Sequence, residues 1–200
     1  MGHITIRELE NMFHSRSRTK TVYFVYSGEV MLYNLTKHGN RKVIFILGKG
    51  QLLNQSIVSK KPNALFCEAV CSVKVIEIAE ERFLQLMEQS HALTRAVLRE
   101  YERNLWRMGH QLKNTTGNMQ MERKIAAKLW KLGRDFGVDT EDGVMIDIDL
   151  TITLMADLVG APRENVSRAC KVLTDRGLIR YGNKRFTLTD SDGLADFYKM

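Results

Sequence analysis

The residues with the clearest chemical potential lie in one short segment near the C-terminus, between positions 161 and 171. Proline is favoured at the first position of a helix, where its missing N–H would have no partner, so Pro162 predicts a helix start. Apolar residues then recur at three-to-four spacing, namely Val166, Ala169 or Cys170, and Leu173. The opposite face carries the polar side chains of Arg163, Glu164, Ser167, Arg168 and Lys171.

A second short helix is expected immediately upstream. Thr151 is a suitable N-cap, the apolar pattern runs through Val159, and Gly160 marks the end. Two short amphipathic helices joined by a tight turn describe a helix-turn-helix, whose second helix presents side chains to the edges of base pairs. The alternative is an ordinary helical hairpin with a solvated charged face.

The segment that follows favours the DNA-binding interpretation. Residues 177–188 predict two short strands around Gly182-Asn183, a hairpin turn signal, and such a hairpin would be the wing of a winged helix-turn-helix. From Thr151 to Thr189 there are seven Lys or Arg against three Asp or Glu, so this small unit carries +4 of the chain's formal charge of +7. Such a surplus of positive charge increases the affinity for DNA, because binding to the phosphates releases their counterions.

The segment Leu150–Leu188 resembles the DNA-binding domain of the CRP/FNR family of bacterial transcription regulators. The family pattern is matched without a gap by Thr151, Ala156, Gly160, Glu164, Ser167 and Arg168. The N-terminal half is similar to the cyclic-nucleotide-binding-like β-roll, through the hairpin pattern of Thr21–Tyr33 and its continuation at residues 38–50. The resemblance covers roughly residues 19–188.

The resemblance implies a homodimer that binds double-stranded DNA at an inverted repeat with a TGA-type half-site core. Arginine donates well to guanine and glutamate accepts from cytosine. The expected base-reading residues are therefore Arg163, Glu164, Ser167 and Arg168, of which Arg163 reads either a neighbouring base or only a phosphate. Contacts to phosphates are expected from Thr151, Thr153 and Lys171. RNA polymerase and a small-molecule effector of unknown identity are the further partners implied.

The pattern as a whole predicts an α+β protein with an antiparallel β-roll, a long dimerisation helix and a C-terminal winged helix-turn-helix. We expect the β-roll sensor at 1–90, the dimerisation helix and hinge at 91–116, and the DNA-binding domain at 117–200. Few residues precede the first clear strand. Either the roll is trimmed, or the first segment, with Ile6, Leu9, Met12 and Phe13, forms a short helix.

A long helix is expected after Ser90, with apolar residues at alternating spacings of three and four. This heptad spacing involves Leu98, Tyr101, Leu105, Met108 and Leu112. Such a helix either lies on its own domain or forms a dimer seam. The seam is favoured here, because paired DNA half-sites demand a two-fold axis. Asn114–Asn118 is the expected hinge.

No cofactor is predicted. Members of the family that bind cyclic AMP use Gly-Glu and Arg-Ser pairs, and the aligned positions here hold Asn54-Gln55 and Asn63-Ala64. An iron–sulfur cluster is disfavoured because no cysteine precedes Cys67, and haem because Ser56 stands near the position of the family's ligating histidine. Cys67 and Cys71 are expected on one face of a strand, as a redox pair or as two buried small residues.

Composition restricts the remaining functions. The chain has 200 residues, 44% of them hydrophobic, without an apolar run long enough for a membrane span or a signal peptide. Three cysteines without a CxxC pair indicate a reducing cytoplasm. The five histidines lack metal-ligand spacing and no phosphate-binding loop is present, so neither a metal site nor an enzyme is predicted. The runner-up function is a signal-binding module that acts through protein contacts, with degenerate DNA binding.

Overall fold

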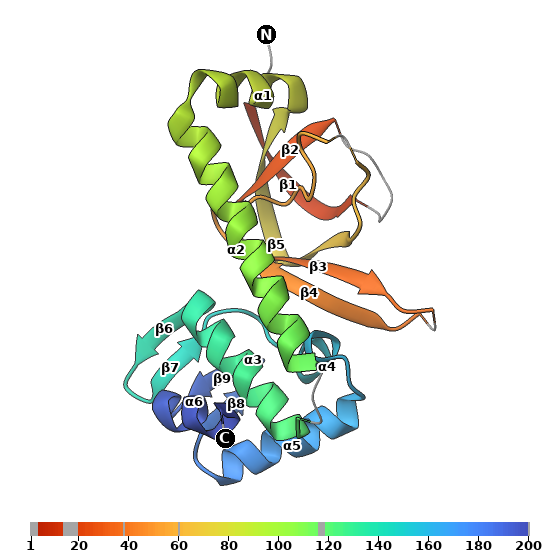
Figure 1. Cartoon of the computed structure of the whole chain (residues 1–200). Helices are drawn as coiled ribbons and strands as arrows, with labels where there is room; N and C mark the ends of the chain where they lie inside the picture. The colour runs from red at the N-terminus through yellow and green to blue at the C-terminus, as the bar shows by residue number, and fades with distance from the viewer. Residues whose placement is uncertain (1–3, 14–19, 38, 60, 116–118, 200) are drawn as a thin grey trace. The chain divides into compact units, whose positions relative to one another are not determined.

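The computed structural model describes residues 4–13, 20–37, 39–59, 61–115 and 119–199. Its contacts divide the chain into two compact units (Figure 1). The first comprises Met1–Gly39 and Val43–Gln111, and the second is built mainly from Leu112–Met200. Among the described residues, no helix is both long and apolar enough to cross a membrane.

The N-terminal unit is the predicted antiparallel β-roll followed by two helices. Its elements are β1 (Ile4–Phe13), β2 (Thr21–Ser27), β3 (Val30–Leu35), β4 (Arg41–Leu47), β5 (Phe66–Ala79), α1 (Glu80–Gln89) and α2 (His91–Thr115). The 14-residue strand β5 organises the sheet, because β1, β2 and β3 all pair with it antiparallel. Strand β4 completes the sheet beside β3 (Figure 1).

The first segment is a strand, so the helical alternative for it is wrong. Strand β1 pairs with β5 from Ile4 opposite Ile78 to Phe13 opposite Cys67. The backbone N–H and C=O groups on that edge of β5 require partners, and β1 supplies them. This demand comes from a strand far along the chain, which is why the local apolar spacing did not reveal it.

A tight turn joins β2 to β3 at Gly28. Its φ of +81° lies in the left-handed region, and a Cβ there would lie 2.4 Å from the carbonyl oxygen of Ser72. Only glycine satisfies both the conformation and the close approach to β5.

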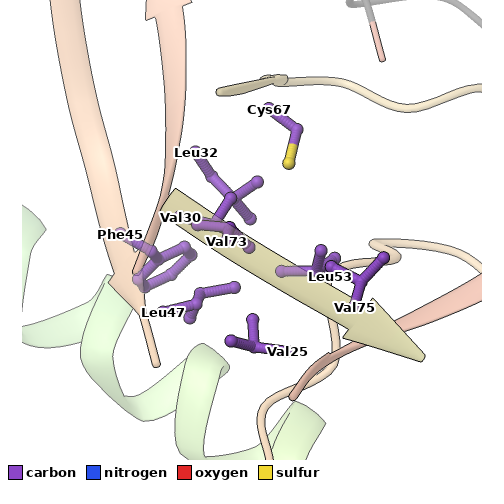
Figure 2. Packing of buried hydrophobic residues seen from close by; sticks show 9 residues of the cluster. All are labelled: Val25, Val30, Leu32, Phe45, Leu47, Leu53, Cys67, Val73 and Val75. Atoms are coloured by element: carbon purple, nitrogen blue, oxygen red, sulfur yellow. The ribbon is translucent and has the colours of Figure 1, made fainter. Parts of the chain in front are cut away.

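One core cluster fills the roll between its strands. Figure 2 shows nine of its side chains gathered beside β5. They are Val25, Val30, Leu32, Phe45, Leu47, Leu53, Cys67, Val73 and Val75. Burial raises the pKa of the Cys67 thiol, which keeps it protonated in this apolar setting.

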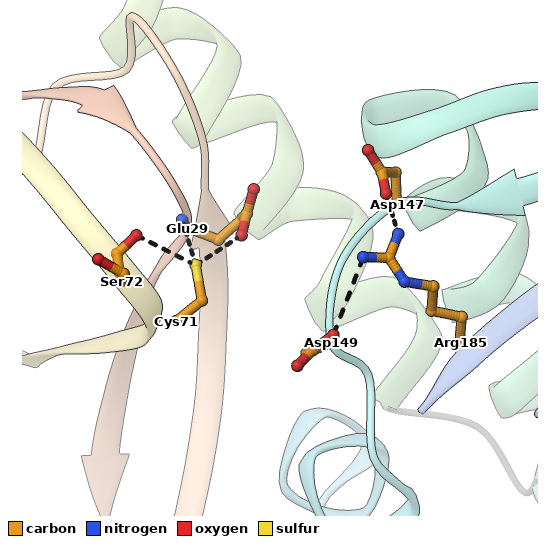
Figure 3. A network of polar contacts seen from close by, with 6 residues as sticks. All are labelled: Glu29, Cys71, Ser72, Asp147, Asp149 and Arg185. Carbon is orange, nitrogen blue, oxygen red and sulfur yellow. Dashed lines mark hydrogen bonds and ion pairs between the residues drawn. The ribbon is translucent and has the colours of Figure 1, made fainter. Parts of the chain in front are cut away.

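Cys67 and Cys71 do not share a face, contrary to the expectation from their spacing. Cys67 is buried, whereas Cys71 is exposed and its thiol donates to the carboxylate of Glu29 over 3.0 Å (Figure 3). After Ala69, β5 leaves its pairing with β3, its register with β1 shifts between Glu68 and Val73, and its pairing with β2 begins at Lys74. The strand's two-residue alternation is broken there, so the spacing no longer predicts the face.

Helix α2 starts where the sequence predicted. The Oγ atom of Ser90 accepts a hydrogen bond from the N–H of Leu93 over 3.2 Å, which satisfies one of the unpaired donors of the first turn. Val97 is buried against the roll, and Gln111 donates to the carbonyl of Ile44 over 2.7 Å. One face of α2 thus packs against the roll of its own unit.

The C-terminal unit is the predicted winged helix-turn-helix (Figure 1). It contains α3 (Met121–Phe136), β6 (Gly137–Thr140), β7 (Gly143–Ile146), α4 (Ile152–Val159), α5 (Arg163–Asp175), β8 (Ile179–Gly182), β9 (Arg185–Leu188) and α6 (Ser191–Lys199). The four strands form one antiparallel sheet in the order β6-β7-β9-β8. Its core includes Leu129, Ile146, Met155, Leu173 and Phe186.

Candidate nucleic-acid interface

Helix α4 is positioned by caps at both of its ends. The Oγ1 atom of Thr151 accepts from the N–H of Leu154 over 3.0 Å, and Gly160 closes the helix in the left-handed conformation at φ +72°. The hydroxyl proton of Thr151 is not used by this bond, so it remains able to donate to a phosphate. Thr153 is exposed on the first turn.

Helix α5 separates its apolar and polar residues as the sequence predicted. Pro162, expected at the first helical position, stands at the N-cap instead, and α5 begins one residue later at Arg163. The buried residues of the helix are Val166, Ala169, Cys170 and Leu173, and burial raises the pKa of the Cys170 thiol to about 11. The exposed residues include Arg163, Glu164, Ser167, Arg168 and Lys171, which we name the α5 face.

Sequence reasoning missed one residue beside the α5 face. The Oδ1 atom of Asn165 accepts a hydrogen bond from the Arg168 guanidinium over 2.6 Å. The Nε of Arg168 also donates to the backbone carbonyl of Glu164 over 3.4 Å. These two bonds use two of the five guanidinium protons, and the other three take no part in them. The i to i+3 spacing of Asn165 and Arg168 is the signal that could have indicated the pair.

The wing is formed by β8 and β9. Gly182 pairs with Arg185, so the two turn residues are Asn183 and Lys184, at φ +50° and +59°. The predicted turn at Gly182-Asn183 is therefore displaced by one residue. Two successive positive φ angles characterise the type I′ turn, and asparagine tolerates them well.

Ion pairs hold the wing to the segment that precedes α4. Figure 3 shows the Arg185 guanidinium between Asp147 and Asp149, with 4.0 Å between its nitrogen and the Asp149 carboxylate. The N–H of Leu150 donates to the carbonyl of Lys184 over 2.7 Å. These contacts join residues more than thirty positions apart, and spacing along the chain did not predict them.

A further pair lies at the outer edge of the sheet. Arg180 of β8 donates to the carboxylate of Asp142, which follows β6. This hydrogen bond and the positive charge of Arg180 lower the pKa of Asp142 below its ordinary value. Asp142 lies in the short turn between β6 and β7, whereas Asp139 and Thr140 belong to β6.

The expected seam residues of α2 fall into two groups. Leu98, Leu105 and Met108 are exposed, with 72% of Leu105 accessible. Tyr101 instead packs against its own roll, where its hydroxyl donates to the carbonyl of Asn54 over 3.3 Å and burial raises its pKa to about 12. The side chain of Leu112 and the hinge residues 116–118 lie outside the described residues.

The segment expected to contact a cyclic nucleotide is engaged in internal hydrogen bonds. Asn54 accepts from the N–H of Tyr23 over 2.7 Å and donates to the carbonyl of Thr21 over 2.9 Å. The Oε1 atom of Gln55 accepts from the N–H groups of Ala64 and Leu65. These N–H groups are thus occupied, and residues 51–65 contain no arginine to pair with a phosphate. The residues present do not fit a cyclic nucleotide.

Comparisons with known proteins agree with both halves of this description. Residues 123–197 match the Crp-like helix-turn-helix domain, and residues 5–90 match the cyclic nucleotide-binding domain. The CRP-like cAMP-activated global transcriptional regulator of Mycobacterium tuberculosis is 25% identical over 175 residues, which cover 87% of this chain and 78% of the relative. The global nitrogen regulator of Nostoc is 23% identical over 187 residues, covering 92% and 83%.

A solved structure shares the fold. FixK2 from Bradyrhizobium japonicum matches with a TM-score of 0.82 at 19% identity, covering 97% of this chain and 96% of that one. The relatives are transcription regulators rather than enzymes. With two domain matches that lie in its two halves and relatives that align with most of its length, the chain belongs to the CRP/FNR family of transcription regulators and carries that family's DNA-binding helix-turn-helix.

Proposed function

We propose that this protein is a homodimeric regulator that reads an inverted DNA repeat with a TGA-type half-site core through the α5 face. The observation that carries the proposal is the α5 face itself, on which Arg163, Glu164, Ser167 and Arg168 are all exposed. A degenerate DNA-binding domain would have no reason to keep these side chains together on a helix whose other face is fully packed.

Base reading follows from the donors and acceptors of the α5 face. Arg168 donates two hydrogen bonds to guanine O6 and N7, and Glu164 accepts from N4 of the paired cytosine. One G·C pair is thereby recognised on both of its bases. Ser167 and Arg163 contact the neighbouring bases.

Phosphate contacts fix the position of α5 without reading sequence. Thr151 and Thr153 supply hydroxyl donors at the start of α4, and Lys171 supplies a charge one helical turn beyond Arg168. These contacts give most of the salt-dependent affinity.

The dimer is formed through α2, where Leu98, Leu105 and Met108 present an exposed apolar strip. We assign residues 1–90 to the sensor, 91–116 to the dimerisation helix and hinge, and 117–200 to DNA binding. An effector, still unidentified, shifts the packing of the two α2 helices until both α5 helices match successive major grooves. The protein works in the cytoplasm, with RNA polymerase as its partner at the promoter.

Selection from a random DNA pool tests the proposal directly. We expect an enriched inverted repeat whose half-sites lie about one helical turn apart, near 10 base pairs. A pool that enriches no repeat would remove the proposal in favour of a module that acts through protein contacts alone.

Removal of Arg185 tests the contribution of the wing. Arg185→Ala leaves Asp147 and Asp149 without their cation, and we expect several-fold weaker binding to all DNA sequences at low salt. Stability should change by about 1 kcal/mol or less, because the pairs are partly exposed. Fluorescence anisotropy at two salt concentrations measures the effect.

The control for this variant separates two roles of Arg185. If Arg185 acts by neutralising the aspartates, adding Asp147→Asn and Asp149→Asn to Arg185→Ala restores binding. A triple variant as weak as Arg185→Ala itself would show instead that Arg185 contacts the DNA.

Cyclic nucleotides are expected to give no saturable heat in calorimetry with the full chain at physiological concentrations. The N–H groups of Ala64 and Leu65 already donate to Gln55, and residues 51–65 hold no arginine that could pair with a cyclic phosphate. The cAMP-activated relative from Mycobacterium tuberculosis serves as the positive control. Micromolar binding of cyclic AMP or cyclic GMP to this protein would contradict the interpretation of residues 54–64.

A further inference from the structure

A hollow of about 680 Å³ opens on the C-terminal unit, away from the α5 face residues. Its lining comes from the start of α3, the end of α5 and helix α6, and α3 packs against both of these helices. Its lining residues are Gln120, Met121, Glu122, Arg123, Val172, Arg176, Leu178, Gly193 and Phe197. This volume falls within the range of small-molecule sites in proteins.

Two guanidinium groups from different elements line the hollow. Arg123 comes from the first turn of α3, and its Nε is buried with no hydrogen-bond partner among the described residues. A buried donor without an acceptor costs free energy, so an acceptor brought by a ligand would stabilise Arg123 in this position. Arg176 ends α5, and its guanidinium carbon lies 4.9 Å above the centre of the Phe197 ring.

The start of α3 adds to this positive potential. Gln120 stands at the N-cap but its side chain makes no capping hydrogen bond. The first N–H groups of the 16-residue helix thus receive no acceptor from the N-cap side chain, and the positive end of the helix dipole lies beside the hollow. Glu122 is the one carboxylate in the lining, so the ionised side chains leave a net charge of +1.

The rest of the lining is apolar. Met121, Val172, Leu178 and Phe197 provide side chains that cover the hydrocarbon part of a ligand rather than bind a bare ion. A carboxylate is the anion whose two oxygens match a guanidinium fork, and one negative charge complements the lining.

We propose that this hollow binds a small monocarboxylate with an apolar or aromatic body, whose carboxylate lies between Arg123 and Arg176. Because Val172 belongs to α5 and Arg176 is its C-cap residue, an occupied hollow stabilises the helix that carries the α5 face. The proposed binding of the acid depends only on the hollow. Its effect on DNA recognition rests on the proposed function.

The test is a titration of the ¹⁵N-labelled full chain, followed by NMR, with monocarboxylates from butyrate to 3-phenylpropionate and indole-3-acetate. The Gly193 amide lies in the lining and reports occupancy. We expect a saturable shift at this amide with at least one acid and none with the corresponding primary amide. If no acid of the series saturates, or if acid and amide act alike, the proposal is overturned.

Charge variants sharpen the result. Arg123→Gln and Arg176→Gln should each lower the affinity for the acid by about tenfold or more, and Glu122→Gln should raise this affinity. Arg134→Gln is the matched control, because Arg134 is an exposed arginine of α3 outside the hollow. The exposed Arg176 keeps the test valid should Arg123→Gln impair folding. If Arg176→Gln bound the acid as tightly as the native protein does, the proposed site would be refuted.

DNA titrations on the same samples separate this proposal from the earlier one. With the proposed function intact, the acid changes the affinity of the native protein for its selected repeat and leaves that of Arg176→Gln unchanged. An acid that binds without altering that affinity would refute the regulatory role. Absence of any DNA binding would refute the proposed function while the carboxylate titration still stands.

Discussion

Arg168→Ala is expected to weaken binding to the preferred DNA repeat by roughly 1–3 kcal/mol and to remove discrimination at one G·C pair in each half-site. The reason is geometric. The Arg168 guanidinium is held beside the α5 face by Asn165, and alanine removes both donors to guanine at once. Titration against the selected repeat, and against repeats changed at that one pair, measures the loss.

Lys171→Ala is the matched control for Arg168→Ala. Both variants remove one exposed positive charge from the same helix. Lys171→Ala should weaken binding to all sequences alike and reduce the salt slope by about one unit, because a phosphate contact carries no sequence information. An Arg168→Ala protein with unchanged base preference would remove the assignment of the α5 face.

Leu105→Asp is expected to convert the dimer to monomers. Across a two-fold seam the substitution brings two carboxylates into an apolar contact, at a cost of several kcal/mol when neither is paired. Analytical ultracentrifugation shows the change in mass, and circular dichroism checks that α2 remains folded.

The control for Leu105→Asp uses another exposed apolar residue of the same unit. Val58 is as accessible as Leu105, at 72%, and lies outside α2. Val58→Asp should therefore remain dimeric. A dimer that survives Leu105→Asp, or one that Val58→Asp dissociates, would place the seam elsewhere on the surface.

The helix-turn-helix could be predicted from sequence because its signals are local. Thr151, Gly160 and Pro162 each act within one turn of their own helix, so the residues that define α4 and α5 are also those that flank them. The same locality explains why the members of the α5 face could be listed in advance. The spacing of Asn165 and Arg168 places them on neighbouring positions of the helix, but the hydrogen bond between them also depends on their side-chain rotamers.

The parts that sequence reasoning missed depend on partners far along the chain. Heptad spacing identifies the apolar positions of α2, but two surfaces compete for that helix, and only the packed structure assigns Tyr101 to its own roll. Likewise, β1 has the strand conformation because β5 lies beside it, and the partner of Arg185 is Asp147, 38 residues away. No local pattern contains this information.

The central place of β5 determines how the roll is assembled during synthesis. Strands β1, β2 and β3 all pair with β5, yet β5 is the last strand of the roll to leave the ribosome. Ile4 pairs with Ile78, which is synthesised much later. At a synthesis rate of about 5–20 residues per second, the nascent β1 has no partner strand for several seconds. A chain interrupted before Phe66 contains β1 to β4 but lacks the strand with which β1, β2 and β3 pair, and such unpaired strand edges favour aggregation. The synthesis of β5 therefore allows nearly the whole sheet to form. Whether the roll folds or aggregates in the cell depends on this step.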